Sequence, residues 1–372
     1  MPVDTSAQLA ALVVASGFGL GAVFGAIARK TDFCTMGAVA DVVNMGDWSR
    51  MRMWLLAIAV AIAGANALDL GGLVDLSRSA YPAPRWPWLG YLTGGLLFGI
   101  GMTLASGCSS RSLIRIGGGN LKSLVAMLFL ALAAEMTVRG LLAPVRSELV
   151  GLLAVRFDQG QDLSWLLAGW LGIGKRSVQP WLAAGCALAL LVFVLKDREF
   201  RADRERMLAS IVIGLVIVGG WYVTGHLGLI AEDPETLQEA YVGTRSARPE
   251  SLTFIGPAAH TLELAQFWTD KSARMTFGVA VLLGTLAGSF AHALAQRRFQ
   301  WESFASAADT RNHIIGGSLM GFGGVTAMGC TIGQGMSGIS TLALGSFLVF
   351  FSIVAGAALT MKLQYQRMLK AG

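Results

Sequence analysis

The sequence predicts an all-α protein that crosses a membrane several times. Hydrophobic residues make up 54% of the 372-residue chain and charged residues only 14%, whereas soluble domains carry about 25% charged residues. The mean hydropathy is +0.59, and apolar runs of the length of membrane spans recur along the chain. We therefore expect one membrane domain, residues 1–372, embedded in a lipid bilayer.

The apolar segments give the expected helices in order. They lie at 8–28, 53–68, 88–106, 121–143, 163–173, 180–195, 207–224, 275–295, 312–328 and 339–361. A full crossing needs about 20 apolar residues, so several segments are short, and many contain glycine. Short, glycine-broken segments are typical of half-helices that enter the membrane and turn back beside a cavity. We expect about nine transmembrane helices plus short re-entrant half-helices.

Basic residues cluster in three places that indicate the orientation. The segment KDREFRADRER at 196–206 carries five of them, QRR follows at 296–298, and three more lie in the tail after Met361. Lysine and arginine are enriched on the cytoplasmic side, so we expect these segments and the C-terminus there. The N-terminus, with no basic residue before Arg29, is expected outside. The segment 225–274 would also face outside, either as a half-inserted element or as a folded cap.

An internal repeat divides the chain. GGLLFGIGMTLASGC (94–108) aligns without a gap on GGSLMGFGGVTAMGC (316–330), and eight of fifteen positions are identical. A weaker match joins 20–30 to 283–293. We interpret these matches as two pseudo-symmetric halves, at about 8–145 and 207–372, with a connector at 146–206. The charge pattern puts residue 94 outside and residue 316 inside, which favours inversion for this pair of segments. Repeated halves with broken helices are a common plan of transporters.

Three of the four cysteines share a sequence context. Cys34, Cys108 and Cys330 each follow a Gly- and Ala-rich apolar segment and precede Ser or Thr. If a short helix starts at each cysteine, its free N–H groups form an anion site, and a thiol donates a weak S–H bond. The pattern indicates a path for a soft, sulfur-bearing anion that passes between thiols. Cys186, in WLAAGCALALL, is interpreted as an ordinary small apolar residue.

Four further residues complete the candidate site on the transport path. Ser109 starts the predicted returning half-helix, and Gln334 follows Cys330. Lys30 and Arg111 add positive charge near the cysteines. Two interpretations of these cations stay open, since Lys30 also fits a positive-inside anchor and Arg111 either touches the ion or holds its hairpin.

Other features of the sequence argue against several functional classes. No Cys/His cluster has metal-ligand spacing, so we expect no metal and no cofactor. The net charge of +6 lies mostly in short loops and reports topology, so no nucleic-acid partner is expected. Glu135 and Arg139 are four residues apart and are expected to form an ion pair on one helix face.

At the cysteine motifs the chain resembles the YeeE/YedE family of sulfur-transport membrane proteins. The resemblance covers nearly the whole chain and rests on GAVFGAIARKTDFC, FGIGMTLASGCSSRSLIRIGGG and GSLMGFGGVTAMGCTIGQGMSG, and less firmly on SLTFIGPAAHTLELAQFW. It implies an hourglass-shaped protein of the bacterial inner membrane with helix–loop–helix elements dipping to the centre. It also implies that Cys34, Cys108 and Cys330 hydrogen-bond the ion along a central path without covalent capture.

The resemblance implies a transporter for thiosulfate or a related sulfur-containing anion, and not an enzyme. It further implies a TusA-like sulfur-carrier protein as a partner on the cytoplasmic side. Alternatives stay open: a membrane sulfurtransferase that forms a cysteine persulfide, a transporter of selenium compounds, or a transporter of an ordinary oxyanion such as sulfate. Changing the three cysteines to serine would distinguish a transporter of an ordinary oxyanion from the others. Hydroxyl groups bind hard oxyanions well, so its transport should be unchanged.

Overall fold

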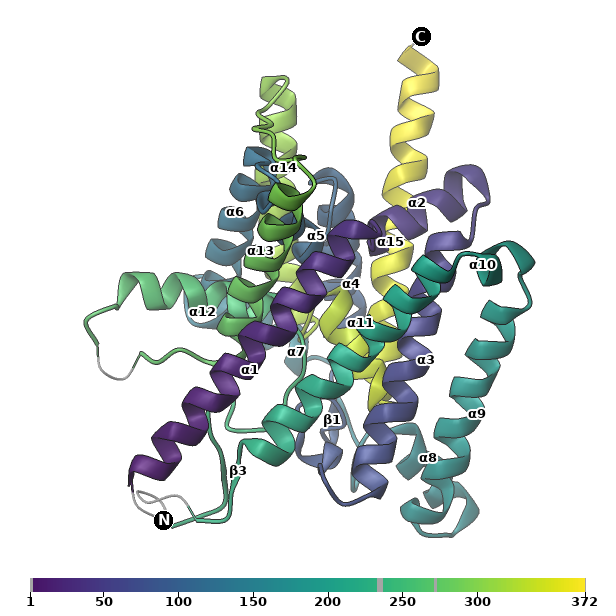
Figure 1. The fold of residues 1–372 in the computed structure, drawn as a ribbon. Coiled ribbons are helices and arrows are strands. Elements are labelled where there is room, and N and C mark those ends of the chain that lie inside the picture. Colours follow the sequence, from purple (N-terminus) through teal and green to yellow (C-terminus); the bar gives the residue numbers. More distant parts are fainter. Residues whose placement is uncertain (1–2, 233–236, 271–272, 372) are drawn as a thin grey trace.

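The computed structural model describes residues 3–232, 237–270 and 273–371. Its long helices form one bundle (Figure 1) and are α1 (Val3–Lys30), α3 (Ser49–Leu70), α4 (Trp88–Leu104), α6 (Leu121–Val138), α9 (Lys175–Leu195), α11 (Arg204–Tyr222), α13 (Phe277–Ala295), α14 (Ala307–Thr326) and α15 (Leu344–Ala371). Eight segments of the described residues are long and apolar enough to cross a membrane. The predicted class, an all-α multi-span membrane protein, is confirmed, whereas the count of nine crossings and the re-entrant half-helices stay predictions.

Short elements connect the long helices. The short helices are α2 (Thr35–Met45), α5 (Ser109–Ile116), α7 (Ala143–Gly151), α8 (Leu163–Leu171), α10 (Arg198–Ala202) and α12 (Ile255–Gln266), with the 3₁₀ turn η1 (Leu76–Arg78) and the π-turns η2 (Val223–Leu227) and η3 (Gly333–Gly338). Two antiparallel strand pairs join β1 (Arg85–Trp86) to β2 (Val155–Arg156) and β3 (Leu229–Ile230) to β4 (Ala240–Tyr241).

The two helices that carry the repeated glycine motif pack against each other in opposite directions. A Cβ built on Gly94 of α4 would lie 2.7 Å from the carbonyl oxygen of Gly323 on α14. A Cβ on Gly101, further along α4, would lie 2.5 Å from the carbonyl oxygen of Gly316, in the middle of α14. Glycine is needed at these contacts because the backbones leave no room for a side chain. The repeat therefore joins two antiparallel helices.

Equivalent glycines of the repeat also face equivalent helices. Gly95 of α4 packs on α15, where its Cβ would lie 3.0 Å from the carbonyl oxygen of Val349. Gly317, the matching residue of α14, packs on α6, where a Cβ would overlap the carbonyl oxygen of Ala126. The contact of α4 with α15 therefore corresponds to the contact of α14 with α6.

The weaker sequence match joins helices with a different relationship. Gly21 of α1 faces the carbonyl oxygen of Val281 on α13, and Gly25 faces that of Thr285, so that a Cβ at either glycine would overlap the backbone. The residue numbers of the contacts increase in the same direction along both helices, so α1 and α13 run parallel. The reversal that relates α4 to α14 therefore does not relate this pair.

The basic segments gather at one end of the bundle. The α10 segment, the connection between α13 and α14, and the end of α15 lie toward the upper part of Figure 1, whereas α1 begins at the bottom. The three segments predicted to share a side thus share an end. The loop after β4 leads into α12, which lies across the bundle near mid-height (Figure 1).

One predicted ion pair is wrong. Arg139, just after α6, directs its guanidinium to Glu263 of α12, with an N–O distance of 2.9 Å. No ion pair between described residues joins Arg139 to Glu135. The sequence spacing of four residues is correct for a helix face, but α12 packs beside α6 and supplies a nearer carboxylate.

Candidate functional site

Each of the three motif cysteines follows a sharp turn at the end of a long helix. The residue two positions earlier has a left-handed backbone, with φ of 50° at Asp32, 55° at Ser106 and 58° at Met328. Such values are uncommon outside glycine and cluster at functional sites. The turn ends the long helix and lets a new helical segment start directly after the cysteine.

The thiols occupy the N-terminal ends of these short helical segments. Cys34 precedes α2 and accepts a hydrogen bond from the backbone N–H of Gly37, at 3.3 Å from Sγ. Cys330 accepts in the same way from Gly333, also at 3.3 Å, and Cys108 Sγ lies 3.2 Å from the Ser110 hydroxyl. Because Sγ of Cys34 and Cys330 acts as an acceptor here, each S–H remains free to donate to another group.

A buried hydroxyl without a partner stands next to every one of these thiols. Thr35, Ser109 and Thr331 directly follow the three cysteines, and their side chains are fully or almost fully buried. None of the three hydroxyl oxygens makes a hydrogen bond to another described residue. Buried polar groups are normally satisfied, and an orphan requires an explanation. The same unpartnered hydroxyl therefore recurs at the three helix starts that follow the motif cysteines.

Cys108 is the middle member of the three thiols. It lies near both Cys34 and Cys330. The Ser109 hydroxyl and the backbone N–H of Phe254 both face the Cys330 sulfur, although Ser109 does not reach hydrogen-bond geometry. The starts of α2, α5, α12 and the helical stretch at 331–340 therefore converge on the thiols, and their dipoles favour an anion between them.

A basic cavity lies on the Cys34 and Cys108 side of the thiols. Its volume is about 450 Å³, and five basic but only two acidic side chains line it: Arg29, Lys30, Arg111, Arg115 and Arg298, with Asp32 and Glu302. These residues come from the end of α1 and the turn after it, from α5, and from the connection between α13 and α14, at the end of the bundle that carries the basic segments.

The two predicted cations have different positions in this cavity. Arg111, on α5, donates to Asp32 Oδ1 at 2.9 Å and thereby joins the Cys108 helix to the Cys34 turn. It also lies near both of those thiols. Lys30 lies at the exposed rim and pairs with Glu205 of α11 at 3.2 Å. The structure thus brings Arg111 to the thiols and leaves Lys30 outside them.

A second cavity lies on the Cys330 side. It has a volume of about 270 Å³, and its lining contains no lysine or arginine; it includes Tyr81, Tyr91, Glu250, Met328, Gly329 and Gln334. The amide nitrogen of Gln334 donates to the carbonyl oxygens of Ala327 and Met328, at 2.8 and 3.0 Å, and its oxygen accepts from Ser346 at 2.6 Å. Gln334 therefore braces the Cys330 turn.

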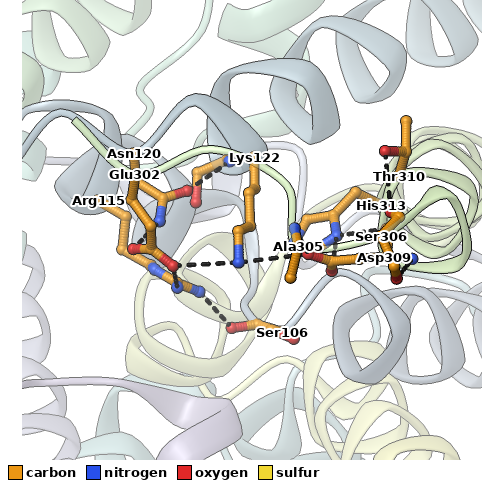
Figure 2. A network of polar contacts seen from close by, with 11 residues as sticks. Ser106, Arg115, Asn120, Lys122, Glu302, Ala305, Ser306, Asp309, Thr310 and His313 are labelled. Atoms are coloured by element: carbon orange, nitrogen blue, oxygen red, sulfur yellow. Dashed lines mark hydrogen bonds and ion pairs between the residues drawn. The ribbon is translucent and has the colours of Figure 1, made fainter.

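A polar network closes the basic cavity from the side of the α13–α14 connection. Figure 2 shows Glu302 accepting from Asn120 and approaching Lys122, whose Nζ lies 3.2 Å from it, and Arg115. Arg115 also donates to the carbonyl oxygen of Ser106, at 3.2 Å, in the turn before Cys108. The network ties the Cys108 turn to a segment almost 200 residues later in the chain.

Sequence reasoning missed Glu302, Lys122 and Glu250. No motif surrounds them, and the partners of Glu302 come from a distant segment. The sequence does contain a signal for the unpartnered hydroxyls, because a Ser or Thr follows each motif cysteine. The absence of hydrogen-bond partners, however, became visible only in three dimensions.

Comparison with known sequences identifies a family and two relatives of the chain. The model of the family described as "Sulphur transport" matches residues 30–359. The thiosulfate transporter TsuA of Escherichia coli (strain K12) is 29% identical over 330 residues, which are 87% of each chain. The thiosulfate transporter TsuA of Spirochaeta thermophila is 26% identical over 345 residues, 92% of this chain and 96% of that protein. With a family match over nearly its whole length, the chain belongs to the sulphur transport family.

Proposed function

We propose that this chain carries thiosulfate, or a closely related sulfur-containing anion, across the bacterial inner membrane through three successive thiol sites. The N-terminus lies outside and the C-terminus in the cytoplasm. The ion then arrives through the cavity beside Cys330, passes Cys108 and Cys34, and leaves through the basic cavity. The observation that carries the proposal is the set of three buried, unpartnered hydroxyls, one beside each thiol.

The donors at each site suit an anion with a soft sulfur end and a hard oxygen end. A thiol S–H is a weak, polarizable donor, while the neighbouring hydroxyl and the helix N–H groups are ordinary donors for oxygen. Each site alone binds weakly. Weak sites in series favour conduction, because an ion held tightly at one site would not leave it.

We propose that the site lies where two halves of the chain meet, with the reversal confined to the pair α4 and α14. We propose halves at about 8–145 and 207–372, supported by the antiparallel packing of α4 on α14 and by the matching glycine contacts of these helices. Transporters with inverted halves place their sites at this interface. The basic cavity draws the ion off the last thiol by its excess of positive side chains. We further propose a TusA-like carrier as the cytoplasmic partner, supported by the family resemblance.

Uptake of radiolabelled thiosulfate tests this function. Cells that lack their own thiosulfate uptake would express the wild type, Cys108→Ala, Cys330→Ala or the control Cys186→Ala at matched membrane levels. We expect the first two changes to abolish uptake and growth on thiosulfate as sole sulfur source. Cys186 is half-buried on α9, outside the thiol group, so its replacement should have almost no effect.

Two results would contradict the proposal. Normal thiosulfate uptake by Cys108→Ala at normal expression would show that transport does not depend on successive thiol sites. Full transport by a variant with all three motif cysteines changed to serine, together with a preference for sulfate, would indicate a path for hard oxyanions instead.

A further inference from the structure

One carboxylate lies on the route that the proposed function gives to the ion. Glu250 lines both cavities at the end opposite the basic cavity, of about 270 and 250 Å³. Its backbone is fixed by Thr224, whose hydroxyl donates to the Glu250 carbonyl oxygen at 2.6 Å and accepts from the Glu250 N–H at 3.0 Å. The side chain therefore has a defined place between the two cavities.

Glu250 has no cationic partner among the ion pairs of the described residues. The Ser246 hydroxyl, 3.3 Å from Oε2, is the polar group that reaches its carboxylate. The nearby arginines are committed to another acid, because Arg245 and Arg139 both pair with Glu263, at 2.8 and 2.9 Å. The Glu250 carboxylate thus faces the proposed anion path without an ion pair of its own, while Arg139 and Arg245 line the smaller cavity and pair with Glu263.

The other titratable groups that line these cavities do not take over this role. His260 accepts through Nε2 from Arg245 at 3.1 Å, and arginine only donates, so the imidazole is held neutral. Tyr81 and Tyr91 are phenols, which stay protonated at neutral pH. Glu135 of α6 borders only the smaller cavity.

We propose that Glu250 is a specificity-determining residue of the outer half of the path and that the anion passes it only when Glu250 is protonated. An ionised carboxylate repels a dianion strongly where little water screens the charges. A carboxylic acid removes that repulsion and offers an O–H that donates to the anion. This inference rests on the proposed transport of thiosulfate and adds a dependence on external pH to it.

The titration range of Glu250 supports the inference. Burial raises the pKa of Glu250 to about 7, well above the ordinary value for glutamate of about 4.3. The protonated fraction then falls from about nine-tenths at one pH unit below this value to about one-tenth at one unit above it. Thiosulfate stays a dianion over this range, so its own titration does not contribute.

The test compares initial rates of thiosulfate uptake at external pH values from about 6 to about 8. Proteoliposomes with a fixed internal pH and membrane potential would hold the full-length wild type, Glu250→Gln, or the control Glu148→Gln, which changes an exposed acid of α7. We expect the wild-type and control rates to fall about tenfold as external pH rises across this range. Glu250→Gln should keep its rate nearly constant, because the amide mimics the neutral acid.

Each other outcome has a distinct meaning. A Glu250→Gln protein that folds but shows the wild-type slope, or no uptake at any pH, overturns the role of Glu250. If Glu250→Gln does not fold, Glu250→Asn gives the same readout. Wild-type uptake that is indifferent to external pH also overturns it and leaves the transport proposal intact. Absence of thiosulfate uptake by the wild type at every pH contradicts the transport proposal itself.

Discussion

The pair of Arg111 and Asp32 allows the two roles of Arg111 to be separated. Arg111 donates to Asp32 at 2.9 Å and lines the basic cavity beside two of the thiols. A guanidinium has five N–H donors, so one bond to Asp32 leaves others for an anion. We expect Arg111→Gln to lower thiosulfate uptake at subsaturating substrate at least tenfold, while Asp32→Asn lowers it less than about fivefold.

The magnitudes follow from exposure. The side chain of Asp32 is 66% exposed and that of Arg111 is 23% exposed, and an ion pair with one exposed partner contributes about 1 kcal/mol or less. That free energy corresponds to a factor of about five. A hydrogen bond from a charged donor to a buried anion contributes about 1.5–3 kcal/mol, which corresponds to roughly 10- to 150-fold. The two roles therefore predict losses that differ measurably.

Initial-rate uptake across a range of thiosulfate concentrations measures the difference. Size-exclusion profiles in detergent would establish that both variants are folded and present in equal amounts. The reasoning would be refuted if folded Asp32→Asn lost as much uptake as folded Arg111→Gln. In that case the arginine acts by holding the Cys34 turn against α5, and the double variant would be no worse than either single change.

Three further outcomes are expected. Gly288→Ala should destabilise the fold by about 1–3 kcal/mol, because its Cβ would overlap the carbonyl oxygen of Ala22; the control Gly19→Ala, which meets no atom within 4 Å, should leave the melting temperature in detergent unchanged or raise it. Cys186 lies outside the three cysteine motifs, so a maleimide label on Cys186 should leave thiosulfate uptake unchanged. Loss of uptake in the labelled protein would contradict this expectation. Burial raises the pKa of Glu302, but hydrogen bonds from a lysine and an asparagine of the α6 region outweigh burial and hold the pKa below its usual value. The stability from this network is then present above about pH 4.3 and lost as pH falls, so Glu302→Gln should lower the melting temperature near neutral pH, with a difference from wild type that disappears in acid.

Much of the fold could be predicted because lipid imposes strong local rules. Apolar length and the absence of charge fix where helices lie, and the predicted segment 275–295 matches α13 within two residues. The gap-free match of 94–108 to 316–330 drew attention to Cys108 and Cys330. It did so because close helix packing allows only glycine at Gly94, Gly101 and Gly316, and this requirement is written directly into the sequence.

The long-range polar contacts could not be predicted in the same way. Arg139 has Glu135 four residues before it, yet it pairs with Glu263, 124 residues later, because α12 packs on α6. Glu302 meets partners that lie about 180 residues earlier. Such pairs depend on which helices become neighbours, and single-sequence periodicity carries no information on that choice.

The short helix α12 begins beside Cys330 without a cysteine before it. α12 begins directly after Phe254, at the place where the other converging helical segments begin after a cysteine. Phe254 is fully buried, and its ring lies 5.7 Å from that of Phe24. The contact it presents to Cys330 is its backbone N–H, so this corner combines one donor with an apolar wall. A fourth thiol here would give an ion at Cys330 two equivalent next sites. With phenylalanine in that place, the thiol beyond Cys330 is Cys108, and the proposed order of sites from Cys330 to Cys34 follows.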